Sequence, residues 1–294
     1  MSRIIQKSPG GLGSAVSGPF SPRDLLLGEE IMASPPSIYL ELSRVLILSG
    51  RTIAGVAGVI EQDAILSARL LALVNRISGG PSRRVATIAQ ALELVGLAAM
   101  RHLVLATLTM DGFRGLGNEL EDPRLFWRQG LLCALIGHGL GARVEGVKGA
   151  AEILFAAGLL HRLGDLIILR RVPELAREAL FRRRDHGLSL AEAERSVLGF
   201  DYGDVGAALA ERWLFPPGLI ELLAFQQRPE RALNQPRLCA LLHLAVGMVQ
   251  DGEPPPVAAP CWPLGGVTVE ILNGARAAAE SRLAEIAEIY NLPS

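Results

Sequence analysis

The chain has 294 residues, enough for one large domain or two smaller lobes around a buried core. Half of the residues are hydrophobic and only 5% are aromatic, and a composition dominated by Leu and Ala favours helices over strands. The 29 basic and 30 acidic side chains leave a formal charge of -1, so no global field attracts the protein to DNA or an anionic membrane. We therefore expect an all-α protein with no membrane partner and with nucleic acid disfavoured, although local basic clusters leave nucleic acid open.

The N-terminal residues and the cysteines indicate the compartment. Residues 1–23 are rich in Gly, Ser and Pro and lack the apolar region of a signal peptide, which predicts a flexible tail and a cytoplasmic protein. The cysteines are far apart and form no CxxC pair, so neither a disulfide framework nor a zinc site is indicated. We expect Cys133 and Cys239 to be buried in apolar helices.

The first predicted lobe, residues 24–112, contains short, capped, amphipathic helices. A first helix is expected between Pro36 and Gly50, and further helices at about 53–60, 64–76, 88–95 and 97–110. Three residues have the character of helix N-caps, namely Thr52, Asp63 and Thr87. The last of them forms a capping box with Gln90, and a loop is expected at residues 78–81.

The glycine-rich residues 111–122 mark the predicted boundary to a second lobe, residues 120–250. Five of its helices are expected at about 123–144, 150–170, 173–186, 218–227 and 236–250. Two more begin at Ser189, which forms a capping box with Glu192, and at Asp201 with Asp204. The 150–170 segment is the most apolar, but it contains charged residues and an interruption near Gly164, so it is predicted to be a core segment and not a membrane span. Residues 251–294 read as a proline-rich linker and a last helix at about 267–290. That helix either docks on the body, which is favoured, or on a second subunit, so a homodimer stays open.

Most signatures of catalysis are missing from the chain. There is no phosphate-binding loop, no GxSxG elbow and no HExxH motif. His161 and Asp165 would share a helix face and are the best pair of metal ligands, but two ligands cannot hold a catalytic ion, so a local hydrogen bond is expected. The other histidines are expected to be satisfied core residues or, for His186, a helix-capping cation: His102, His138, His186 and His243.

Five segments, in order, resemble the HDOD family. The run from Ile60 to Asn75 is similar to the family's I-x-x-D-P-x-L-x-x-x-L-L-x-x-x-N helix, and residues 85–97 to its V-x-S-I-x-x-A-I-x-x-L-G segment. The remaining three matches are Phe126-Trp127-Arg128, Ala157 to His161, and Leu198 to Tyr202 with the helix that follows. The resemblance covers residues 28–250, which is most of the chain expected to be ordered.

This resemblance implies an all-α bacterial signal-transduction module related to HD-type metal-dependent phosphohydrolases, with an HD-domain-like C-terminal lobe. The chain departs from the hydrolase pattern at almost every expected ligand. Gln129 stands where the hydrolases have a histidine, and Arg162 stands where they have the aspartate of the His-Asp pair. The aspartate of their last core helix corresponds to a position near Val246. The later histidine pair corresponds to Gln226-Gln227, and Asp165 stands where the family often has a lysine. An arginine places a cation where the metal ion would lie, so the resemblance implies a degenerate HD motif without metal, cofactor or catalysis.

We therefore expect a regulatory module that binds a protein partner in a signalling pathway, or a small anionic or nucleotide ligand in a remnant pocket. The expected pocket residues are Gln129, His161, Arg162, Asp165, Gln226 and Gln227. Arg162 has the geometry to bind a phosphate or carboxylate, but an internal salt bridge with Asp165, Glu152 or Asp201 is favoured.

Two other functions stay open. One is a diverged HD-type metal-dependent phosphohydrolase. The other is nucleic-acid or cyclic-nucleotide binding through Arg83-Arg84 or through residues 182–184, three consecutive arginines for which a solvated helix end is the favoured interpretation.

Overall fold

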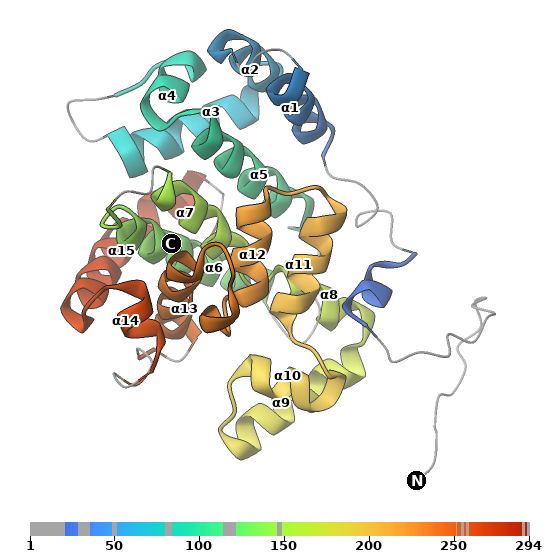
Figure 1. Cartoon of the computed structure of the whole chain (residues 1–294). Coiled ribbons are helices and arrows are strands. Elements are labelled where there is room, and N and C mark those ends of the chain that lie inside the picture. The colour runs from blue at the N-terminus through green and yellow to red at the C-terminus, as the bar shows by residue number, and fades with distance from the viewer. Residues whose placement is uncertain are drawn as a thin grey trace.

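The computed structural model describes residues 21–28, 36–48, 52–79, 84–113, 122–145, 149–250, 252–253, 256, 259–289 and 292. Every regular element in these ranges is a helix, which confirms the expected all-α class (Figure 1). Most of the predicted tail and of the predicted lobe boundary lie outside the described residues.

The N-terminal helices form a group above the rest of the molecule (Figure 1). Their bounds are α1 Ser37–Leu48, α2 Ile53–Ile60, α3 Ala64–Val74, α4 Ile88–Val95 and α5 Leu97–Phe113. Thr52, Asp63 and Thr87 each accept a hydrogen bond from a backbone N–H of the first turn, as predicted, and the Thr87–Gln90 capping box is present. Where a loop was expected from residue 78, a π-helical turn, η3 (Asn75–Gly79), extends α3.

The helices from residue 123 to residue 250 share one hydrophobic core with the N-terminal helices. They are α6 Pro123–Gly141, α7 Ala150–Leu160, α8 Leu163–Arg171, α9 Pro173–His186, α10 Leu190–Leu198, α11 Tyr202–Arg212, α12 Pro217–Phe225, η4 Pro229–Arg231 and α13 Pro236–Gln250. Helices α9 and α10 extend from the body as a pair (Figure 1). The buried Cys133 and Cys239 lie in α6 and α13, as predicted.

The predicted interruption of the 150–170 segment falls at His161 and Arg162, two residues before Gly164. Gly164 has a different role, because it brings α8 into backbone contact with α11. A Cβ atom added to Gly164 would lie 2.0 Å from the Tyr202 carbonyl oxygen and 2.6 Å from the Gly206 nitrogen. The absence of a side chain at Gly164 thus allows the close spacing of α8 and α11, which carry Asp165 and Tyr202 of the candidate site.

The first and the last described helices pack on the body. The last helix, α15 (Val269–Ile289), lies along α6 and also contacts α3, so it packs on its own chain (Figure 1). A short helix, α14 (Cys261–Gly265), occupies part of the predicted linker, because Cys261 and Trp262 are buried beside α13. The first described element, the 3-10 helix η1 (Pro22–Leu26), packs on α8 and α11.

None of the described helices alone combines the length and the apolar composition needed to cross a membrane. One bent pair, Ile88–Val95 with Leu97–Asp111, meets these two criteria when both helices are taken together, at an angle of 116°.

Candidate functional site

Arg162 is the centre of the site that the sequence predicted. Its Nη1 donates to Gln129 Oε1 at 3.0 Å, and its Nε donates to Asp165 Oδ2 at 3.1 Å, while Nη2 forms an ion pair with the same carboxylate. The guanidinium also lies 5.0 Å from the ring centroid of Phe126. Arg162 is 8% exposed and Asp165 3%. The predicted internal salt bridge is thus present, formed with Asp165, and it is buried.

His161 lies in the turn between α7 and α8. Its Nδ1 is 2.7 Å from the carbonyl oxygen of Gly158, so Nδ1 carries the hydrogen and Nε2 presents a lone pair. Burial, and then the charge of Arg162, lower the pKa of His161 to about 3, which keeps the ring neutral. The expected hydrogen bond between His161 and Asp165 is absent, because the helix breaks between them and Nε2 has no partner.

The two glutamines at the end of α12 hold different parts of the site. Gln226 is fully buried, and its Nε2 donates to the His161 carbonyl oxygen at 2.8 Å. Gln227 donates instead to the hydroxyl of Tyr202 at the start of α11. Gln226 therefore holds the α7–α8 turn, while Gln227 connects the end of α12 to α11. The six predicted residues thus gather in one region of the structure.

Glu194 on α10 is a buried acid that the sequence reasoning missed. It is 1% exposed, and its Oε2 accepts from the Tyr202 backbone N–H at 2.7 Å. Burial, and then the nearby carboxylate of Asp165, raise the pKa of Glu194 well above its usual value, while Arg162 opposes this shift. The sequence pattern does indicate that Glu194 is buried, because it lies four residues from both Leu190 and Leu198 on the apolar face of its helix.

We refer to these residues together as the Arg162 cluster: Gln129, His161, Arg162, Asp165, Glu194, Tyr202, Gln226 and Gln227. Asp201, another acid considered as a partner of Arg162, caps α11 and lies beside Arg195 and Arg228. Burial, and then Asp204, raise the pKa of Asp201. Val246 is buried at 2% exposure and contributes no ligand atom.

The donor atoms of the Arg162 cluster do not fit a metal ion. Within the part of the chain that the structure describes, no three His, Cys, Asp or Glu side chains are grouped to hold one. The Asp165 carboxylate is already paired with Arg162, and the Gln129 amide oxygen accepts from the same guanidinium. A metal ion would have to be held beside this positive charge.

Three other buried or half-buried histidines lie outside the Arg162 cluster. His243 Nδ1 is 2.7 Å from the Gln226 carbonyl oxygen, as expected for a satisfied histidine. His102 Nδ1 and His138 Nε2 are buried without a hydrogen-bond partner, so the expectation of satisfied rings is wrong for these two. Their burial lowers the pKa of each to about 4, so both rings are neutral.

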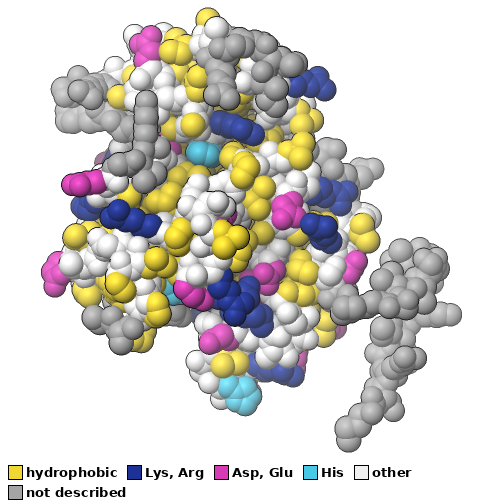
Figure 2. Space-filling model, in the orientation of Figure 1, with side chains coloured by type: hydrophobic (Ala, Val, Ile, Leu, Met, Phe, Trp, Pro, Cys, Tyr) yellow, Lys and Arg dark blue, Asp and Glu magenta, His cyan; other side chains and the backbone are white. Residues whose placement is uncertain are grey.

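The arginines at the end of α9 take part in local pairs. Arg182 pairs with Glu178 at 2.8 Å, and Arg184 with Asp185 at 3.0 Å. Acidic and basic side chains are interspersed on the face shown in Figure 2. These contacts fit the solvated helix end that the sequence favoured, whereas Arg83 lies outside the described residues.

Comparisons with known proteins agree with the resemblance noted in the sequence. The chain is 25% identical over 224 residues to an uncharacterized protein of Treponema pallidum, a match that covers 75% of this chain but only 43% of that relative. An HDOD domain protein of unknown function from Geobacter sulfurreducens has a similar structure, with a TM-score of 0.67, 21% identity, and 92% and 97% of the two chains covered.

Two other solved structures share the fold. A protein of Shewanella amazonensis, provisionally named a phosphohydrolase, gives a TM-score of 0.65 at 24% identity, with 91% of this chain and 99% of that one covered. A protein of Marinobacter aquaeolei, provisionally named a signal transduction protein, gives 0.67 at 17% identity, with 93% and 61% covered. The sequence profile of the HDOD domain matches residues 32–229, which include α1 to α12 and all of the Arg162 cluster. This chain belongs to the HDOD domain family.

Proposed function

We propose that this chain is a non-catalytic regulatory module of bacterial signal transduction that acts by binding a protein partner. The observation that carries this proposal is the position of the Arg162 guanidinium, which bridges Gln129 and Asp165 in the remnant HD site. It supplies the positive charge that a hydrolase obtains from a metal ion, but it has no open coordination position at which to activate water. The provisional name of the Marinobacter aquaeolei structure is in keeping with a signalling role.

We favour a protein partner because the buried Arg162 site is poorly suited to bind a small anion. A phosphate or carboxylate ligand would have to displace Asp165 from Arg162 and enter a region where the arginine is 8% exposed. Breaking the buried Arg162–Asp165 ion pair in this way costs several kcal/mol in typical cases, about 3–5. The Arg162 cluster therefore acts as an internal polar core that fixes the helices around it.

A diverged phosphohydrolase is the second candidate. One observation favours it, because His161 keeps an unpartnered Nε2 lone pair in the buried site, as a metal ligand requires. The provisional name of the Shewanella amazonensis structure points to the same class.

The two candidates are separated by assaying the full chain against bis(p-nitrophenyl) phosphate and cyclic dinucleotides with added Mn²⁺, Fe²⁺, Ni²⁺ or Zn²⁺. We expect no turnover above that of buffer with the same metal. The matched control is His161→Ala, because turnover by a surviving site would be lost in this variant. Metal-dependent turnover by the wild type that His161→Ala abolishes would overturn the proposal and establish the second candidate.

A further inference from the structure

The N-terminal segment Ser21–Gly28 is seated on a surface formed by α8 and α11, which we call the η1 groove. Leu25 and Leu26 are each 2% exposed, so both side chains are inserted, whereas Leu27 is 59% exposed. This segment precedes the residues that match the HDOD domain, which begin at 32. The groove is thus a surface of the matched domain that a preceding segment of the same chain covers.

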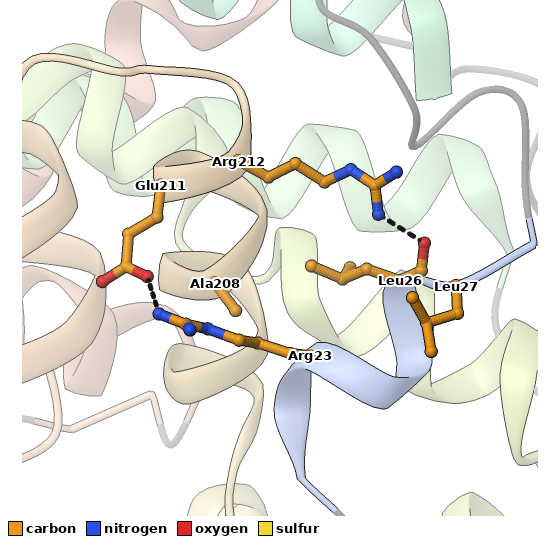
Figure 3. A pocket seen from close by; sticks show the side chains of 6 residues that line it. All are labelled: Arg23, Leu26, Leu27, Ala208, Glu211 and Arg212. Carbon is orange, nitrogen blue, oxygen red and sulfur yellow. Dashed lines mark hydrogen bonds and ion pairs between the residues drawn. The ribbon is translucent and has the colours of Figure 1, made fainter.

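Two arginines around the groove donate hydrogen bonds to backbone carbonyl oxygens of the bound segment. Arg212 Nη1 donates to the Leu26 carbonyl oxygen at 2.8 Å, and Arg171 Nη2 donates to the Leu27 carbonyl oxygen at 2.8 Å. The end of any helical turn offers unpaired carbonyl oxygens of this kind. At the other side, Arg23 forms an ion pair with Glu211 at 2.9 Å. Figure 3 shows the Arg23 and Arg212 contacts on either side of Ala208.

Space remains between the segment and α11. A cavity of about 400 Å³ lies there, lined by the residues drawn in Figure 3. An adjoining cavity of about 390 Å³ reaches Asp204, Ala207 and Ala224. The small side chains Ala207 and Ala208 face these cavities from α11, so the segment is held by its two leucines and its polar contacts and leaves part of the groove unfilled.

We propose that the η1 groove is a binding site for a short helical turn of a partner protein, one with an arginine, two adjacent leucines and free carbonyl oxygens after them. The chain's own Ser21–Gly28 has this chemistry and occupies the site until a partner displaces it. Arg171 and Arg212 recognise the end of the turn, Glu211 recognises its arginine, and the buried face of the groove takes the leucines. The close contact at Gly164 holds α8 against α11, the two helices that form the groove.

Tethering determines how the site responds to competition. A segment joined to its groove through the same chain has an effective concentration on the order of mM when the linker is short. A peptide added in trans therefore competes poorly with the wild type and binds much better once the tethered segment is released. This difference gives the proposal a measurable signature.

The test uses the full chain and a fluorescein-labelled peptide of residues 20–28, followed by fluorescence anisotropy. In the variant Leu25→Glu/Leu26→Glu, the tethered segment is released, and we expect this protein to bind the peptide at least tenfold more tightly than the wild type does. A control peptide with the same two substitutions should bind at least tenfold more weakly. Adding Arg212→Gln to the released variant should weaken binding about tenfold, because a charge-assisted hydrogen bond is lost.

Absence of saturable binding to the released variant, or equal binding of the two peptides, would overturn the proposal. If circular dichroism shows that the released variant does not fold, hydrogen exchange in the wild type tests whether the groove binds the peptide. Peptide added above the effective concentration of the tethered segment, on the order of mM, should speed amide exchange at residues 23–28, and unchanged exchange at that excess would reject the site. A wild-type dimer that the double substitution converts to a monomer would also overturn the proposal, because a second copy's segment would then be the occupant.

Discussion

The α8–α11 helix pair uses arginine in opposite ways on its two faces. In the Arg162 cluster, the guanidinium is 8% exposed and is enclosed by Asp165, Gln129 and Phe126. At the η1 groove, the side chains of Arg23 and Glu211 are 78% and 49% exposed, and Arg212 binds a backbone carbonyl. A buried charge is costly to leave unpaired, whereas an exposed pair contributes little. The inner face therefore holds the fold together, while the outer face can release its occupant.

The largest effect is expected from Arg162→Met, which removes the cation that is paired with the buried Asp165 carboxylate. We expect the free energy of unfolding at pH 7, measured in urea, to fall by about 3–5 kcal/mol. Arg184→Met is the matched control, since Arg184 pairs with Asp185 on the surface and should cost less than about 1 kcal/mol. Similar losses of unfolding free energy in both variants would show that the buried Arg162–Asp165 pair contributes no more than an exposed pair.

Gly164→Ala should come next, because its new Cβ atom would collide with the backbone of α11. We expect a loss of about 1–3 kcal/mol, or more if the helices cannot move apart. Gly274→Ala on α15 introduces the same atom into open space and should stabilise the protein by up to about 1 kcal/mol. Thermal unfolding of the pair measures both effects, and an unchanged melting temperature for Gly164→Ala would contradict the close contact.

Glu194→Gln should change how stability depends on pH. The pKa of Glu194 is higher in the folded protein than in the unfolded chain, so the folded state binds the proton more tightly. The resulting stability is present below the unfolded pKa and is lost as pH rises through the folded pKa. Gln keeps an acceptor for the Tyr202 N–H without ionising, so the variant should gain stability relative to the wild type as pH rises from 4 to 8. Parallel urea titration curves across this range would argue against a protonated Glu194.

The smallest effect is expected at the outer face. Arg23→Ala removes an exposed ion pair and should change the free energy of unfolding by less than about 1 kcal/mol. Amide hydrogen exchange at residues 23–28 should rise only slightly. Arg212→Gln serves as the comparison, since loss of its bond to the Leu26 carbonyl should cost about 1 kcal/mol and speed that exchange more. A larger effect of Arg23→Ala would mean that the ion pair, and not the carbonyl contact, holds η1.

Local chemistry explains which features of the fold were predictable. Thr87 and Ser189 cap their helices as expected, because a capping box is completed within four residues of sequence. The Arg162–Asp165 pair was also within reach, since its members are three residues apart. The position of η1 depends instead on contacts with residues far away in the chain, such as Arg171 and Arg212, and no local pattern encodes them.

The same limit applies inside the site. Gln129 was expected there through the family resemblance alone, because it lies 33 residues from Arg162 in sequence. The partner of Glu194 is a backbone N–H on the next helix, which side-chain patterns do not reveal. The break at His161 was displaced from Gly164 because the glycine serves packing against α11 and not chain reversal.

The most direct measurement is the metal content of the full chain, purified without chelators and analysed by mass spectrometry for Fe, Mn, Ni and Zn. If the Arg162 guanidinium supplies the positive charge of this site, each metal should be far below one ion per chain, and His161→Ala should leave these values unchanged. One bound ion per chain in the wild type, lost in His161→Ala, would contradict the assignment of Arg162 as the cation of the site.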